Sequence, residues 1–168
     1  GFTRYLGTQT SGYANVIFQD EIGDDDEQFF KTGISLVYDD YSELLGASDT
    51  IGGNQYDLTE IVPGAYFEYS MTKANMSLIL GARADYHNVY GLFGTPRLHL
   101  RYNLDEHKTL KLAAGSGRRS ANVIMENVGL LATSRKWYFE GDNSLPGYGL
   151  RQEIAWNQGL GYMQDFRL

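Results

Sequence analysis

The sequence predicts an all-β protein, an antiparallel up-and-down meander of about seven strands in which one long loop carries a short helix. Three observations predict this class. Apolar and polar side chains alternate over many stretches, and short connections alternate with long ones along the chain. The composition, with 20 glycines, 13 tyrosines and 3 prolines in 168 residues, suits extended strands and tight turns better than a helical bundle.

Alternation is clearest over residues 76–87. Apolar side chains fall there on every second residue from Met76 to Tyr86, and the alternate set of residues includes Arg83, Asp85 and His87. Successive side chains of a strand point to opposite faces, so this segment has one apolar face and one polar face. The same pattern predicts the other strands, in chain order, over residues 12–20, 30–39, 64–69, 96–103, 109–117 and 152–166.

The connections between these strands differ in length in a regular way. Short polar connections fall at residues 23–27, 72–75 and 103–108, and longer ones at residues 41–59, 88–95 and 116–150. In a meander, alternate connections lie at the same end of the sheet, so the tight turns would share one rim and the long loops the other. Outer-membrane β-barrels segregate their connections in this way.

Strand length and aromatic placement favour the same interpretation. Several alternating runs approach the roughly 9–11 residues that a tilted membrane strand requires, against about 5–6 in soluble proteins. Aromatic rings near strand ends are typical of the girdles at membrane–water interfaces. The rings concerned belong to Tyr38, Tyr41, Tyr69, Tyr86, Tyr90, Tyr102, Tyr162 and Phe166. The sequence therefore predicts part of a transmembrane β-barrel, with the polar strand face toward a lumen.

Composition and motif spacing oppose several functional classes. The formal net charge of −7 opposes nucleic-acid binding, and the absence of cysteine excludes disulfide scaffolds and thiol nucleophiles. The three histidines, His87, His99 and His107, lack the spacing of a helical metal site, and the acidic run at residues 24–27 lacks the spacing of a calcium loop. No nucleophile-elbow motif is present. We expect no catalytic centre, no resident metal and no cofactor.

Candidate binding residues lie in the long loop and on the polar strand face. Residues 122–132 are compatible with a short helix, and the simplest interpretation of the loop is a lid that packs its own aromatic side chains. A more specific hypothesis is that the loop shapes a ligand vestibule and that two strand arginines line the lumen. The vestibule residues are Arg118, Arg119, Trp137, Tyr138 and Tyr148, and the lumen residues are Arg97 and Arg101.

Several segments resemble a known family. Residues 95–137, TPRLHLRYNLDEHKTLKLAAGSGRRSANVIMENVGLLATSRKW, are similar to a barrel segment of TonB-dependent outer-membrane receptors, most of all to the group typical of Bacteroidota. Residues 81–94 and 151–168 resemble the strands on either side, and residues 4–23 and 29–41 fit less specifically. The likeness rests on a succession of segments and not on a catalytic motif.

This resemblance implies a 22-stranded barrel that encloses a plug domain and captures scarce nutrients at the surface of a Gram-negative cell. The inner-membrane TonB complex would drive uptake, and the bilayer and lipopolysaccharide would surround the barrel. The nutrient could be a siderophore, haem, a vitamin such as cobalamin, or a glycan. We expect residues 1–168 to form a single barrel fragment without plug domain or TonB box, whose two sheet edges favour self-association when isolated.

Two other architectures fit the alternation. In a small soluble lipocalin-like barrel, the face of Leu78, Leu80, Leu98 and Leu100 would point inward to an apolar ligand and the arginines outward to water. A complete eight-stranded outer-membrane barrel would need one more strand, within residues 1–10.

Overall fold

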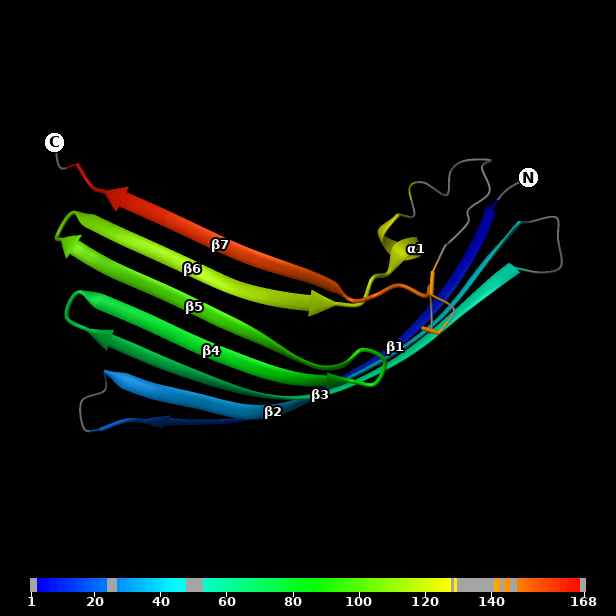
Figure 1. The fold of residues 1–168 in the computed structure, drawn as a ribbon, viewed down its shortest axis with the longest axis horizontal. Coiled ribbons are helices and arrows are strands. Elements are labelled where there is room, and N and C mark those ends of the chain that lie inside the picture. Colours follow the sequence, from blue (N-terminus) through cyan, green and yellow to red (C-terminus); the bar gives the residue numbers. More distant parts are fainter. Residues whose placement is uncertain are drawn as a thin grey trace.

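A computed structural model describes residues 3–23, 27–47, 53–127, 129, 141–142, 144–145 and 148–166. Its strands form one antiparallel sheet in which each strand pairs with its sequence neighbours, in the order β1 to β7 (Figure 1). The elements are β1 (Thr3–Glu21), β2 (Gln28–Ala47), β3 (Gly53–Lys73), β4 (Met76–His87), β5 (Gly91–Asp105), β6 (Lys108–Arg119), α1 (Val123–Glu126) and β7 (Glu153–Gln164). The predicted all-β meander is confirmed.

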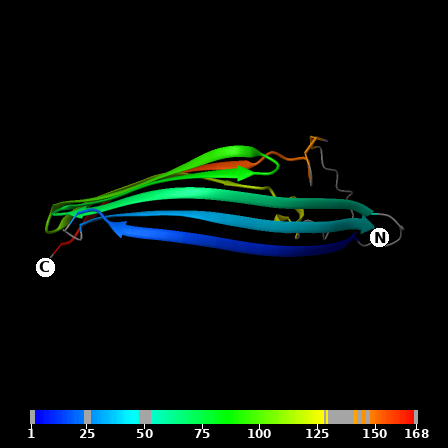
Figure 2. The same ribbon diagram turned by 90° about the horizontal axis from the view of Figure 1, so that it is seen from below.

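The sheet is curved along its length, and α1 lies over its concave side (Figure 1). The turns after β1, β3 and β5 lie at one end, and the connections after β2, β4 and β6 at the other. Seen from below, β1, β2 and β3 run almost the full length of the sheet (Figure 2). Within the described ranges, no helix is long and apolar enough to cross a membrane.

Solvent exposure along the strands is the reverse of that in a soluble protein. Polar groups are buried on one face, where Glu43 is 4% and His87 3% exposed, while Leu80 is 44% and Trp156 65% exposed on the other. Among the described residues, only Leu45, Ile124 and Tyr148 are buried hydrophobic side chains. Ile124 of α1 packs with Leu45, which shares the face of Glu43. The polar face is therefore the concave face, and the apolar face is convex.

This curvature contradicts the lipocalin-like architecture, which requires the leucine face to be concave. Leu80 and Leu98 are cross-strand partners on the convex face. The eight-stranded alternative placed an additional strand within residues 1–10. That placement is wrong, because residues 3–10 form the first part of a continuous β1.

The prediction of a long loop at residues 41–59 was wrong, since β2 and β3 remain paired up to Gly46 opposite Gly53. The connection predicted at residues 88–95 is also shorter, because β5 begins at Gly91. Alternation disappears in the first segment because the convex face itself becomes polar there. Ser42 donates to Asp57 at 2.7 Å and Thr59 to Asp40 at 2.7 Å. This part of the hairpin extends past the apolar band.

The apolar band has aromatic side chains near both limits. Tyr38 and Tyr86 are on the convex face toward the β2–β3 and β4–β5 connections. Phe30 stacks with Phe67 toward the opposite end of the strands, with ring centroids 6.1 Å apart. Met76 to Tyr86 spans ten residue steps, which is about 33 Å along the strand and about 25 Å across a bilayer at a tilt of about 40°. That height matches the apolar band of an outer-membrane barrel.

Two of the predicted girdle tyrosines lie on the other face. Tyr41 lines a concave-face cavity together with Glu43. Tyr90 places its ring 4.6 Å from His87 and donates its hydroxyl to the carbonyl of Leu150 at 3.2 Å. Both rings therefore belong to the interior, because the pleat and the adjoining turn direct them away from the apolar band.

If the convex face contacts lipid, Leu80→Arg should lower the free energy of unfolding in bilayers by roughly 2–4 kcal/mol, because the charge would lie in hydrocarbon. Ile79→Arg, one residue away on the concave face, is the control and should cost clearly less. Equilibrium unfolding of the full-length protein in lipid vesicles measures both. Equal losses for the two variants would contradict the assignment of faces.

Candidate functional site: a cavity on the concave face

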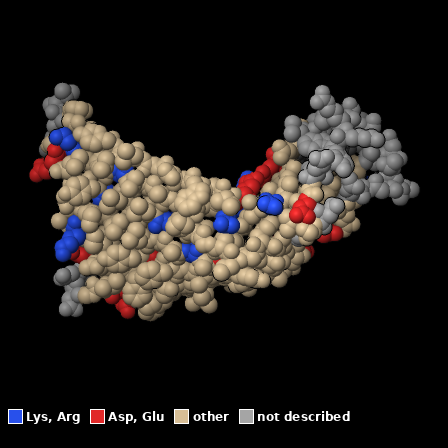
Figure 3. Space-filling view, in the orientation of Figure 1, with Lys and Arg blue, Asp and Glu red and all other residues tan. Residues whose placement is uncertain are grey.

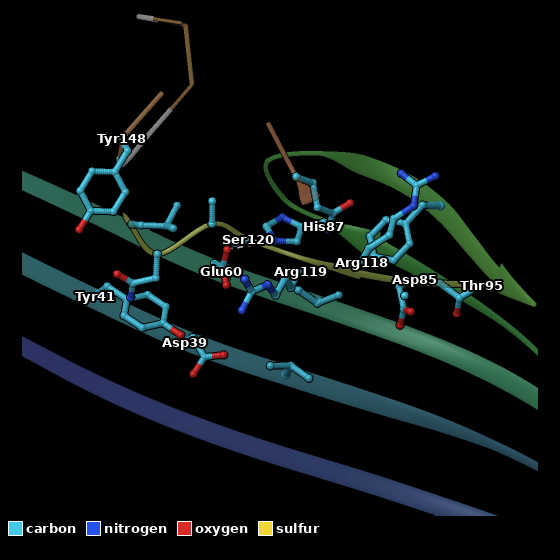
Figure 4. A pocket seen from close by; sticks show the side chains of 18 of the residues that line it. Asp39, Tyr41, Glu60, Asp85, His87, Thr95, Arg118, Arg119, Ser120 and Tyr148 are labelled. Atoms are coloured by element: carbon cyan, nitrogen blue, oxygen red, sulfur yellow. Dashed lines mark hydrogen bonds and ion pairs between the residues drawn. The ribbon is translucent and has the colours of Figure 1, made fainter. Parts of the chain in front are cut away.

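A cavity of about 490 Å³ lies on the concave face (Figure 4). It is at the end of the sheet that carries the β2–β3, β4–β5 and β6–β7 connections. The strands β2 to β6 line it, and the segment after β6 and the residues before β7 complete it. Its walls combine carboxylates, arginines and aromatic rings. A volume of this size is in the range of small-molecule binding sites.

The pleat and the strand register place the charged side chains on the cavity floor. Asp39 of β2 is the direct cross-strand partner of Glu60 of β3, and Glu43 is the partner of Tyr56. Because every second residue points to the same face, Asp39, Tyr41 and Glu43 line the cavity together. The same alternation brings Asp85 and His87 of β4 to its wall.

Glu43 joins β1, β2 and the end of the long connection. The hydroxyl of Tyr5 donates to Glu43 Oε1 at 2.6 Å, and the hydroxyl of Tyr148 donates to Oε2. The Tyr148 ring lies 4.9 Å from the ring of Tyr56, and Ile124 and Leu45 pack beside it. This buried group fixes the returning part of the long connection against the concave face.

The ring of His87 is oriented by a backbone contact. The amide of Val89 donates to Nδ1 at 3.1 Å, so the ring proton is on Nε2. Nε2 lies 3.3 Å from Glu60 Oε1 and 3.4 Å from the Ser120 hydroxyl. Glu60 and Ser120 thus share one ring nitrogen. A nucleophilic triad needs them on opposite nitrogens, so this cluster positions the connection and does not activate Ser120.

Arg83 and Asp85 form an ion pair in the wall of the cavity. Arg83 Nε donates to Asp85 Oδ2 at 2.7 Å, Nη2 lies 2.6 Å from Oδ1, and Nη2 also donates to Ser35 at 2.7 Å. Gly64 is the cross-strand partner of Asp85, and a Cβ at this position would collide with the Asp85 carboxylate. The glycine therefore leaves the space that the ion pair occupies.

The structure brings three of the predicted site residues to this cavity: Arg118, Arg119 and Tyr148 (Figure 4). Arg119 forms ion pairs with Glu126 at 2.9 Å and Glu153 at 2.7 Å, which join β6 to α1 and β7. Trp137 and Tyr138 lie outside the described residues.

Arg118 is placed where β6 separates from β5. The pairing of these strands ends at Arg97 opposite Gly115, next to Pro96, which has no amide hydrogen for a ladder. Beyond that point, the Arg118 guanidinium lies 5.1 Å from the centroid of the Phe93 ring. Such a contact is a cation–π interaction.

The two predicted lumen arginines, Arg97 and Arg101, do not line this cavity. They border two other hollows, both of which also include His99. In Figure 3, acidic side chains lie mostly toward the ends of the face in view, and the stretch between carries Lys and Arg.

The acidic floor of the cavity, formed by Asp39, Glu43 and Glu60, was not predicted from the sequence. Glu43 was assigned to a loop, so that no face could be given to it, and Asp39 was placed at a strand end. Continuing the period of two beyond Tyr38 would have placed Asp39, Tyr41 and Glu43 on one face. Within the described ranges, no group of three or more His, Asp or Glu side chains could hold a metal ion.

These features define a class of fold: the curved wall of a β-barrel with an apolar outer face and a polar inner face. A solved structure of this class, the siderophore receptor PirA from Acinetobacter baumannii, is similar to 97% of this chain with a TM-score of 0.57 and 16% sequence identity. The chain covers 25% of that receptor's length. No family model and no curated protein sequence matches the chain. The likeness shows a shared β-barrel fold.

Gly64→Ala should displace the Asp85 carboxylate and lower the free energy of unfolding by about 1–3 kcal/mol, because a buried ion pair would lose its geometry. Gly81→Ala is the control, since a Cβ there would meet Arg97 at an ordinary 3.5 Å. Denaturant unfolding of the two variants makes the comparison. A Gly64→Ala protein as stable as Gly81→Ala would show that the pair adapts at no cost.

Burial and the hydrogen bond to Glu43 raise the pKa of Tyr148 above that of an ordinary tyrosine. The folded state then favours the neutral phenol, so its stabilising effect is present below the unfolded pKa of about 10 and is lost as pH rises through the raised value. The difference in alkaline absorbance titration between wild type and Tyr148→Phe should show one phenol that ionises above pH 10. Glu43→Gln should move that transition downward, and a Tyr148 transition at or below pH 10 would contradict the contact.

Proposed function

We propose that this chain is part of the barrel wall of an outer-membrane TonB-dependent receptor that takes up a small nutrient. One observation carries the proposal: long strands curve so that their apolar face is convex and their polar face concave. This arrangement suits a barrel wall whose convex face contacts a bilayer and whose concave face contacts a wet or plugged lumen. In water, the convex face would expose more apolar surface than soluble monomers do.

The solved neighbour supports the receptor class because it is a siderophore receptor. A siderophore is therefore one candidate nutrient, beside haem, a vitamin and a glycan. The narrower likeness to receptors of Bacteroidota rests on the sequence segments and stays a prediction. A plug domain and the TonB complex are the proposed partners of the full-length protein, and the bilayer and lipopolysaccharide are the proposed surroundings of the convex face.

The sheet edges fit the proposed barrel. Almost all residues of β1 and β7 are exposed, and each strand has one unpaired backbone edge. In a complete receptor, further strands would pair with both edges and continue the wall. The same unpaired edges would favour self-association of residues 1–168 produced alone.

The cavity is the proposed ligand vestibule. It lies at the end of the sheet that carries the β6–β7 connection, which is the longest one. The longer loops of outer-membrane barrels are extracellular, so we propose that this end is the extracellular one. Arg118, Arg119 and Tyr148 contribute to its wall. Arg97 and Arg101 are proposed to face the lumen farther from that rim.

Residues 1–168 contain no cysteine, so single thiols at Leu100 and Arg101 test the proposed location directly. These neighbours lie on opposite faces. The experiment uses the full-length protein, with any cysteine outside residues 1–168 replaced. Arg101→Cys should react with water-borne maleimides and Leu100→Cys with bilayer-dissolved reagents, and both proteins should leave the cell envelope only in detergent. A protein that is soluble without detergent, or labelling with the faces exchanged, would refute the membrane assignment.

The transport function requires a separate experiment. A strain lacking the full-length gene should lose growth on one of four limiting sources, namely a ferric siderophore, haem, cobalamin or a glycan. Removal of the TonB complex should cause the same loss. Normal growth on all four sources, with the protein demonstrably in the outer membrane, would count against nutrient uptake.

A further inference from the structure

We infer that the cavity binds a ligand through a positively charged organic group, an ammonium or a guanidinium, held over Asp39 and Glu60. This inference rests on the proposed function only in treating the cavity as the ligand vestibule. It concerns the chemical class of the ligand, which the fold likeness leaves open.

The first argument is the balance of charge on the cavity wall. Three carboxylates, those of Asp39, Glu43 and Glu60, have no Lys or Arg within ion-pair distance among the residues that the structure describes. Their polar contacts are instead hydroxyl groups and the imidazole of His87. Ser11 donates to Asp39 at 2.5 Å, and His87 contacts Glu60.

The cations of the wall are mostly engaged elsewhere. Arg83 is paired with Asp85, and Arg119 lies between two carboxylates of its own. Arg118 is over the Phe93 ring, on the β5–β6 side and not on the floor formed by β2 and β3. The floor therefore keeps an excess of negative charge.

The second argument is the direct opposition of Asp39 and Glu60. They are cross-strand partners on one face, a position in which like charges destabilise a sheet. Glu60 is buried, and water can screen it only in part. A cation placed between the two carboxylates would remove this repulsion and form charge-assisted hydrogen bonds with both. Ammonium and guanidinium groups carry several donors and no acceptor, so they fit the acceptor oxygens of the two carboxylates.

Aromatic side chains complete the site. Tyr41 stands on the floor near Asp39 (Figure 4), and Phe93 and Tyr148 belong to the walls. Ring faces attract organic cations, which adds to the preference for an alkylammonium over a hydrated metal ion. The cavity is large enough for a drug-sized organic molecule.

The test uses three probes of one shape that differ in charge: phenethylamine, phenethyl alcohol and phenylacetate. Their dissociation constants are measured by ligand-observed NMR with the full-length protein in detergent micelles at low salt. The amine should bind about tenfold more tightly than the alcohol, and phenylacetate most weakly. The preference for the amine should decrease as salt is added. Equal binding of the three probes, or tighter binding of phenylacetate, would overturn the inference.

Matched variants locate the effect. Asp39→Asn and Glu60→Gln keep the shape of the floor and should each remove most of the preference for the amine. Glu68→Gln is the control, because Glu68 is on the same face of β3 but outside the cavity, 3.9 Å from Lys31. An equal loss in Glu68→Gln would show a general field effect and refute the site. Salt dependence in the wild type keeps the test valid if one variant fails to fold.

The outcome is separable from that of the proposed function. Binding of the amine requires neither transport nor a TonB complex. A protein that leaves the envelope without detergent but prefers phenethylamine through Asp39 and Glu60 would refute the receptor and retain the site. An outer-membrane receptor that shows no such preference would refute the site alone.

Discussion

The structure depends on one constraint: every strand residue is assigned by the pleat to one of two faces whose surroundings differ completely. The convex face carries leucine, valine and aromatic side chains, and the concave face carries ion pairs and hydroxyl networks. A shift of register by one residue would exchange the two sets. The long uninterrupted pairing of β1, β2 and β3 keeps this assignment over the whole length of the sheet.

Polar side chains take over the role that an apolar core has in a soluble domain. Few apolar side chains are buried among the described residues, and specificity on the concave face comes from groups that must find particular partners. Glu43 receives two phenols, Arg83 bridges Asp85 and Ser35, and the Val89 amide fixes the tautomer of His87. A polar network of this kind is costly when one of its members loses its partner. The glycine opposite Asp85 leaves the carboxylate room to keep its contacts with Arg83.

The sequence was informative wherever the two faces differ in polarity. In β4, leucine and alanine alternate with arginine, aspartate and histidine, and both the strand and its faces could be predicted. Around Asp40 and Asp57 both faces are polar, so the period of two disappears although the strands continue. The cavity could be predicted only in part for a similar reason. Arg118, Arg119 and Tyr148 belong to a conspicuous loop, whereas the contact of Tyr148 with Glu43 joins residues 105 positions apart and leaves no local signal.

The order of the strands has a consequence for assembly. Each strand pairs with the one that precedes it, so the sheet can grow by successive hairpins with short loop closures. The contact between Glu43 and Tyr148 is an exception, because it closes a loop that contains four complete strands and α1. Its entropic cost is met only after those strands are in place. The part of the cavity wall formed by Tyr148 can therefore be completed only after β3 to β6 have formed.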